Sequence, residues 1–475
     1  MISLLALIII LIIIIIKAFM IYFKMGFFKF FTNSSYYKSA NLEFDNKSSN
    51  SFNENKPNIS DFHGRRPWKS KVNDKELNSF LKWFVGFTDA EGNFLISLDR
   101  GYIRFRFKIC MHIDNLEALN IIKSKLNIGK VTIEKDRNKC SFVVQDFIGI
   151  KDVICPIFIQ FPLLTSKNLD FQDFYQAVLI KNKKNLSKVD KEKIISLKIG
   201  MNSQREIFKS ISLNSQINVS PEWFIGFLEG DGTFGIKTGS SMYIQVAQKN
   251  TSIDCINAII AFLKSLESNL LKDSKILPLN IVSTINKKTN VISLVISNVD
   301  ALYYYILPLL DNFNMYTYKE IDFKLWRIAL LLKIHGYYYL PEGKKLFLDV
   351  SNVLNKRYST GSIEKENLDK KLEDIFYKYQ VILLTDPPFN INDNIPHVNN
   401  ARKFRLENKS DLPKTIYIYG NGKLIKGSPF NSYSKVHKAL GLKSTSNTCN
   451  RYLDTKRLYK SKYIFTSYPL SSSKD

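Results

Sequence analysis

The chain has 475 residues, a length that suggests two or three domains rather than one. Apolar residues make up 45% and charged residues 23%, which excludes a wholly disordered chain, and five scattered cysteines without a CxxC pair argue against a disulfide framework or a zinc site. Lysine and arginine number 68 against 43 acidic residues, so the net charge of +25 indicates a polyanionic partner, and nucleic acid is the leading candidate.

The first 31 residues form a hydrophobic leader. Residues 2–16 are apolar apart from Ser3, and a second apolar run follows Lys17, so the segment is long enough to span a bilayer. It lacks the basic region of a secretory signal and the arginine-rich pattern of a transit peptide. Two interpretations stay open: a membrane anchor, or a translated extension of an AT-rich gene. Residues 32–76 are rich in Asn, Ser and Lys and are expected to be a disordered linker.

One motif occurs twice, 140 residues apart. Residues 83–94 read WFVGFTDAEGNF, and residues 223–234 read WFIGFLEGDGTF. Each copy has apolar residues at helical spacing and reaches a glycine at its end. The second copy follows Ser220 and Pro221, an N-cap and a proline at the first helical position. Both copies therefore predict helices that end at glycine.

Small residues four positions apart leave one face of each predicted helix nearly bare; they are Gly86 with Ala90 and Gly226 with Gly230. Two such faces can pack backbone to backbone, which would bring Glu91 and Asp231 together at the ends of adjacent helices. There the two carboxylates repel each other and face the negative ends of the helix dipoles, so at least one pKa should rise. A divalent cation removes both problems, and Mg²⁺ suits such oxygen ligands. The alternative is that both acids are merely solvated.

The segment after the first motif alternates strictly between cationic and apolar residues. As a strand, residues 103–109 place Arg104, Arg106 and Lys108 on one face, while Tyr243 and Gln245 take the corresponding positions in the second copy. This cationic face fits a nucleic-acid surface, although such faces also arise by chance. Further along each half, the pattern predicts helices near 115–126 and 253–266, and hairpins at 131–145 and 280–297.

A second repeated signal closes each half. The frame Thr-x-Lys-x-x-Asp-Phe occurs at residues 165–171 and again at residues 317–323. A lysine beside paired acids can stabilise negative charge on a phosphorus centre or polarise a water molecule. The alternative is that Lys167 and Lys319 only cap the helices that follow them.

These motifs resemble those of a single-chain LAGLIDADG homing endonuclease with two motif copies. The resemblance implies an α+β fold of two pseudo-symmetric αββαββα half-domains, residues 77–205 and 206–360, whose sheets form a saddle over DNA. It also implies site residues: Glu91, Asp231, Lys167 and Lys319 as catalytic residues, Glu91 and Asp231 with Ala90 and Gly230 as metal ligands, and Ser97, Arg104, Arg106, Lys108, Lys237, Tyr243 and Gln245 as DNA contacts. Asp89 and Glu229 resemble the non-catalytic acid of the motif and are expected to be structural.

The resemblance further implies a function. A member of this family would be a monomeric, Mg²⁺-dependent, site-specific endonuclease that hydrolyses both strands of a double-stranded DNA target with a staggered cut. Intron homing from an organelle gene, and hence a mitochondrial location, would follow. Two other functions stay open: an RNA maturase that binds its host intron RNA, and a catalytically idle, membrane-anchored DNA-binding protein.

The C-terminal region predicts a linker and a small basic module. Residues 361–412 mix acidic and basic residues and are expected to be the linker, whereas residues 414–475 hold 12 Lys and Arg against 2 Asp. A hairpin is predicted at 416–425, and helical patterns at 432–440 and 444–453 have helix-turn-helix spacing.

Residues 413–470 resemble the intron-encoded nuclease repeat, a helix-turn-helix DNA-binding module. On this resemblance Ser444, Thr445, Asn447 and Asn450 would contact bases, while Lys443 and Arg451 would contact phosphates. The alternative is a basic tail that binds nucleic acid without order.

Overall fold

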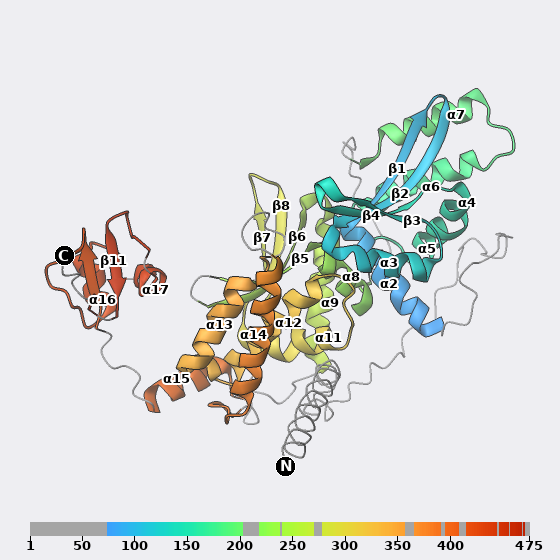
Figure 1. Cartoon of the computed structure of the whole chain (residues 1–475). Coiled ribbons are helices and arrows are strands. Elements are labelled where there is room, and N and C mark those ends of the chain that lie inside the picture. The colour runs from blue at the N-terminus through green and yellow to red at the C-terminus, as the bar shows by residue number, and fades with distance from the viewer. Residues whose placement is uncertain are drawn as a thin grey trace, which may run out of the picture. The chain divides into compact units, whose positions relative to one another are not determined.

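The computed structural model of the chain describes residues 74–202, 218–237, 240–269, 278–356, 365–390, 395–407, 415–443, 446–455, 457–467 and 469–470 (Figure 1). The hydrophobic leader and almost all of the first predicted linker lie outside these residues; the first helix already begins at Asp74. Within the described ranges, no helix is long and apolar enough to cross a membrane.

The first half is built around a four-stranded antiparallel sheet in the order β1-β2-β4-β3. Its elements are α2 (Asp74–Glu91), β1 (Gly92–Asp99), β2 (Tyr102–His112), η3 (Ile113–Asn115), α3 (Leu116–Leu126), β3 (Lys130–Glu134), η4 (Lys135–Arg137), β4 (Lys139–Val144), α4 (Phe147–Gly149), η5 (Ile150–Ile154), α5 (Cys155–Gln160), α6 (Lys167–Lys181) and α7 (Lys188–Ile199). The predicted helix and hairpin positions are confirmed, with the hairpin turn at η4.

The second half repeats this arrangement with the sheet order β5-β6-β8-β7. Its elements are α8 (Pro221–Asp231), β5 (Gly232–Ile236), β6 (Met242–Lys249), η7 (Asn250–Ser252), α9 (Ile253–Ser265), η8 (Leu266–Asn269), β7 (Val282–Asn286), β8 (Val291–Ile296), α10 (Val299–Ala301), η9 (Leu302–Ile306), α11 (Leu307–Asp311), α12 (Lys319–Ile334), η10 (Tyr337–Tyr339) and α13 (Pro341–Val353). The predicted α+β class with two αββαββα halves is thereby confirmed.

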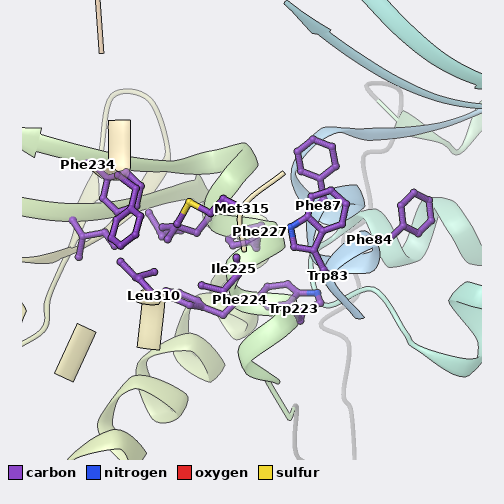
Figure 2. Packing of buried hydrophobic residues seen from close by; sticks show 14 of the residues in the cluster. Trp83, Phe84, Phe87, Trp223, Phe224, Ile225, Phe227, Phe234, Leu310 and Met315 are labelled. Atoms are coloured by element: carbon purple, nitrogen blue, oxygen red, sulfur yellow. The ribbon is translucent and has the colours of Figure 1, made fainter. Parts of the chain in front are cut away.

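The two motif helices, α2 and α8, pack directly against each other, and Figure 2 shows the aromatic side chains that surround this interface. A methyl group at Gly86 would lie 2.0 Å from the carbonyl oxygen of Trp223, and one at Gly226 would lie 2.1 Å from that of Trp83. Side chains are therefore sterically excluded at both positions. The predicted backbone-to-backbone packing is confirmed.

The strands that follow the motif helices alternate in burial as predicted. In β2, Phe105 and Phe107 are buried, whereas Arg104 and Arg106 are exposed. In β6, Met242, Ile244 and Val246 are likewise buried. Each half thus presents a polar face of its sheet opposite the face that packs on the helices.

The segment expected to be a linker, residues 361–412, instead contains α14 (Lys365–Leu383) and α15 (His397–Glu407). Leu368, Leu372, Ile375 and Tyr379 recur at spacings of four, three and four residues and are buried in the core shared by the two halves. This helical periodicity outweighs the high charge content that suggested a linker.

The C-terminal residues form a small unit with its own hydrophobic core. The three-stranded sheet has the order β10-β9-β11, and the elements are β9 (Tyr417–Gly420), β10 (Lys423–Leu424), α16 (Tyr433–Ala439), α17 (Thr448–Tyr452) and β11 (Tyr463–Thr466). The core consists of Ile416, Ile418, Phe430, Val436, Cys449 and Phe465. The predicted hairpin is confirmed, but α17 is shorter than expected, and the helix-turn-helix assignment stays a prediction.

Candidate functional site

Glu91 and Asp231 adjoin at one end of the α2–α8 interface. Each is the last residue of its helix, and a methyl group at Gly230 would lie 3.2 Å from Cγ of Glu91. Burial raises the pKa of Asp231 to about 6, with a further contribution from the charge of Glu91, and burial also raises the pKa of Glu91. The expected rise is present, but desolvation rather than repulsion is its largest cause.

The two lysines of the second repeated motif lie at the same end of the α2–α8 interface as Glu91 and Asp231. Lys167 begins α6, and its Nζ donates to the carbonyl oxygens of Thr88 at 2.9 Å and Ala90 at 3.2 Å. Lys319 begins α12, and its Nζ donates to the carbonyl oxygens of Gly230, at 3.3 Å, and of Gly232. Both ammonium groups thus lie at the negative ends of the motif helices, rather than capping the helices that the lysines begin. Burial lowers the pKa of both lysines.

Asp89 holds the loop that carries Lys167. Its carboxylate accepts hydrogen bonds from the backbone N–H groups of Leu164 at 2.8 Å and Thr165 at 3.0 Å, and from the Thr165 hydroxyl at 2.6 Å. It also accepts a 2.9 Å hydrogen bond from the indole of Trp223, which belongs to the other half.

Glu229 makes the matching contacts in the second half. Its carboxylate accepts from the backbone N–H groups of Tyr316 at 2.9 Å and Thr317 at 2.7 Å, and from the indole of Trp83 at 2.7 Å. Burial raises the pKa of Glu229 to about 7, while these donors oppose that rise. Both buried acids therefore have structural roles, and each joins one lysine loop to the opposite half.

Gln248 is a site residue that the sequence patterns did not reveal. It lies on β6, and its Nε2 donates to Oδ2 of Asp231. The strand pairings of Gly92 with Ile109 and of Gly232 with Val246 make Met111 the corresponding residue of the first half. The surroundings of the two acids therefore differ, because Asp231 has a hydrogen-bond donor on β6 whereas the matching position of the first half is Met111. A polar residue at a strand position that otherwise faces the core is the pattern that could have identified Gln248.

The donor set fits a hard cation with few protein ligands. Within the described ranges, no group of three or more His, Cys, Asp or Glu side chains could hold a metal ion. The protein would offer the carboxylates of Glu91 and Asp231 and the carbonyl oxygens of Ala90 and Gly230, each of which keeps a lone pair beyond its lysine contact. Such oxygen ligands suit Mg²⁺, which retains waters and substrate phosphates.

The sheet residues predicted to contact DNA occupy the polar faces of the two sheets. Ser97 pairs across the strands with Arg104, whose guanidinium lies 3.0 Å from Asp99. In the second half, Nζ of Lys237 lies 5.2 Å from the ring centroid of Tyr243. The remaining residues of this set are Arg106, Lys108 and Gln245, and these are exposed or partly exposed.

The residues predicted to contact DNA from the C-terminal unit are described only in part. Lys443, Asn447 and Arg451 have exposed side chains near α17. Ser444 and Thr445 lie outside the described residues, and the same is true of the Asn450 side chain.

Comparison with known sequences finds one matching family model and several relatives. A family model described as LAGLIDADG endonuclease matches residues 84–178 and 224–330. The uncharacterized mitochondrial protein RF1 of Saccharomyces cerevisiae is 27% identical over 409 residues, which cover 82% of this chain and 82% of that protein. The probable intron-encoded endonuclease Cox1-I1b of Schizosaccharomyces pombe is 34% identical over 162 residues, 33% of this chain and 41% of that protein.

Comparison with solved structures supports the fold. The LAGLIDADG homing endonuclease I-GzeII, solved in complex with its DNA target, has a TM-score of 0.50 at 23% identity, covering 58% of this chain and 99% of that one. The homing endonuclease I-SmaMI, solved with cleaved DNA, has a TM-score of 0.50 at 20% identity, covering 61% and 99%. The two-half architecture is therefore shared with these proteins.

Proposed function

Because a LAGLIDADG endonuclease family model matches two segments of the chain, we propose that it is a site-specific endonuclease that cuts both strands of a double-stranded DNA target. The observation that carries this proposal is the convergence of two acids and two lysines at the end of the α2–α8 interface. The names of the yeast relatives support an intron-encoded gene of mitochondrial origin.

The proposed chemistry is hydrolysis of one phosphodiester bond in each strand, leaving a staggered cut. Glu91 and Asp231, with the carbonyl oxygens of Ala90 and Gly230, would hold Mg²⁺. When bound, such an ion neutralises phosphate charge and lowers the pKa of coordinated water. Lys167 and Lys319 would place buried positive charge beside the phosphate, where negative charge develops during the reaction.

Recognition of the target would come from the polar faces of the two sheets. Arg104, Arg106 and Lys108 are spaced two residues apart along β2, so their side chains follow one face of the sheet. Arginine pairs with guanine edges in the major groove or with phosphates. The C-terminal unit would add phosphate contacts through Lys443 and Arg451, with base contacts from its polar residues.

The experiment is a cleavage assay on the purified chain, which we expect to act as a monomer. A duplex that joins the sequences flanking the intron of its gene is incubated with Mg²⁺, and the matched control is a duplex of equal length that contains the intron junction. We expect cutting of both strands in the first duplex only, and none with EDTA. No cutting of either duplex, together with tight binding of the intron RNA, would instead support the maturase function.

A further inference from the structure

We propose that Asn115 and Ser252 are positioning residues that act across the interface, each fixing the active-site lysine of the opposite half. Asn115 of the first half would set the place of Lys319, and Ser252 of the second half would set that of Lys167. The inference rests on the proposed function, since it concerns lysines assigned to that reaction.

The contact to the first lysine loop comes from η7. Ser252 is the last residue of this turn, and its Oγ accepts a 3.1 Å hydrogen bond from the backbone N–H of Ser166. The two serine hydroxyls are also 3.2 Å apart and hydrogen bonded. Ser166 immediately precedes Lys167 and is the N-cap of α6. A side chain from the second half thus fixes the backbone adjacent to the lysine of the first.

The contact to the second lysine loop is its pseudo-symmetric counterpart. Asn115 is the last residue of η3, and its Oδ1 accepts a 2.9 Å hydrogen bond from the backbone N–H of Tyr318. Tyr318 immediately precedes Lys319 and is the N-cap of α12. Asn115 and Ser252 are 137 positions apart, the same offset that relates Ile109 on β2 to Val246 on β6. Different residue types therefore make the same contact in the two halves.

Both side chains are buried, with exposed fractions of 2% for Asn115 and 4% for Ser252. Buried polar groups are retained when they have hydrogen-bond partners, and loss of one partner leaves the other unpaired. Here the unpaired group would be the backbone N–H of the residue directly before the lysine, Ser166 or Tyr318. Removing either side chain should therefore shift the start of α6 or α12 rather than only loosen the interface.

Each lysine loop has a second contact with the opposite half. The indole of Trp223 reaches Asp89, which holds Thr165, and the indole of Trp83 reaches Glu229, which holds Thr317. Each threonine lies two residues before a lysine. Two consecutive loop positions are thus held, directly or through a buried acid, by the opposite half. The position of each ammonium group near the motif-helix carbonyls consequently depends on the other half.

The test compares Asn115→Ala with Ser252→Ala, which serve as matched controls for each other. The reactivity of each lysine toward a trace acylating reagent is measured from pH 6 to 11 on the intact, metal-free chain, with the labelled peptides quantified by mass spectrometry. We expect Asn115→Ala to change the profile of Lys319 and leave that of Lys167 unchanged, and Ser252→Ala to do the reverse. This readout does not require cleavage, so it separates this inference from the proposed function.

Strand-resolved cleavage gives the second readout. Lys167→Met and Lys319→Met first identify the strand that depends on each lysine. Asn115→Ala should then slow the Lys319-dependent strand by about tenfold or more, because small misplacements of catalytic groups have large effects on rate. If each substitution acts on the lysine of its own half, or on both lysines equally, the cross-interface assignment is wrong. Should Asn115→Ala fail to fold, Ser252→Ala, which removes one oxygen atom, decides the question alone.

Discussion

Hydrogen-bond donors separate the four motif acids into two kinds. Asp89 and Glu229 are buried, and each accepts at least three hydrogen bonds from backbone and indole groups. Asp231 accepts one from Gln248, and no described residue donates to the carboxylate of Glu91. Fully partnered acids are structural, whereas acids with spare oxygen lone pairs remain able to bind a cation.

The raised pKa of Asp231 predicts how Asp231→Asn changes stability with pH in the absence of metal. A carboxyl group whose pKa is raised in the folded state penalises folding when ionised. The penalty is absent below the ordinary pKa of 3.8, grows up to about pH 6 and is complete above it. We therefore expect Asp231→Asn to raise the free energy of unfolding by on the order of 2 kcal/mol at pH 7.5, and to have little effect at pH 4.

Urea denaturation in EDTA at both pH values measures this difference. Glu192→Gln, which removes the same charge from an exposed position on α7, is the matched control. An Asp231→Asn effect that is the same at pH 4 and pH 7.5 would show that ionisation of this carboxyl group is not penalised.

At the scale of elements, the α2–α8 contact predicts that a single methyl group disrupts the interface. In Gly226→Ala the new Cβ would lie 2.1 Å from the carbonyl oxygen of Trp83, a backbone atom, so the helices must separate. We expect a loss of at least about 1–3 kcal/mol in thermal or urea unfolding, the usual range for overpacking. Gly200→Ala is the control. Its new Cβ would lie 3.6 Å from the carbonyl oxygen of Leu197, an ordinary contact distance, so this substitution should be tolerated. Equal effects of the two substitutions would contradict the close packing.

The polar face of β2 gives a prediction about DNA binding. Arg106→Glu should weaken binding strongly, because it places a negative charge on the polar face of β2 that we propose contacts phosphates or guanine edges. Lys184→Glu makes the same charge change at an exposed residue between α6 and α7, which is not part of either sheet, and should have a much smaller effect. Fluorescence anisotropy with one duplex at constant salt measures both. Comparable losses of affinity for the two variants would mean that the polar face of β2 does not contact the DNA.

The repeated motif, the helical spacing of apolar residues and the alternation of polar and apolar residues were sufficient to predict the motif helices, the paired acids and the alternating strands. The contacts of Asn115 and Ser252 could not be predicted, because they join segments that lie 203 and 86 positions apart and cross between the halves. Gln248 lies only 17 positions after Asp231, and its one signal in the sequence is a polar residue at a strand position that otherwise faces the core. Helix α14 was predictable in principle from the spacing of Leu368 and Leu372 with later apolar residues, but its high charge content obscured that pattern.

At the scale of the whole molecule, the C-terminal unit has a hydrophobic core separate from the core of the two halves. Residues 414–475 carry +10 of the total net charge of +25. Truncation after Glu407 should therefore weaken DNA binding and flatten its salt dependence, by about 0.9 in the logarithmic slope for each lost phosphate contact. Strand cleavage at saturating protein should persist. An unchanged slope would show that this unit does not contact the DNA.

The most direct test of the endonuclease assignment is the cleavage rate of Glu91→Gln in Mg²⁺ on a duplex with both strands labelled. The substitution preserves the shape of the side chain but removes a ligand charge, so DNA binding should persist while cutting of at least one strand falls by 100-fold or more, on the order of what loss of one catalytic group causes. Glu192→Gln should cut at the wild-type rate. If Glu91→Gln also cuts both strands at the wild-type rate, the paired acids are structural and the chain does not cut DNA at this site.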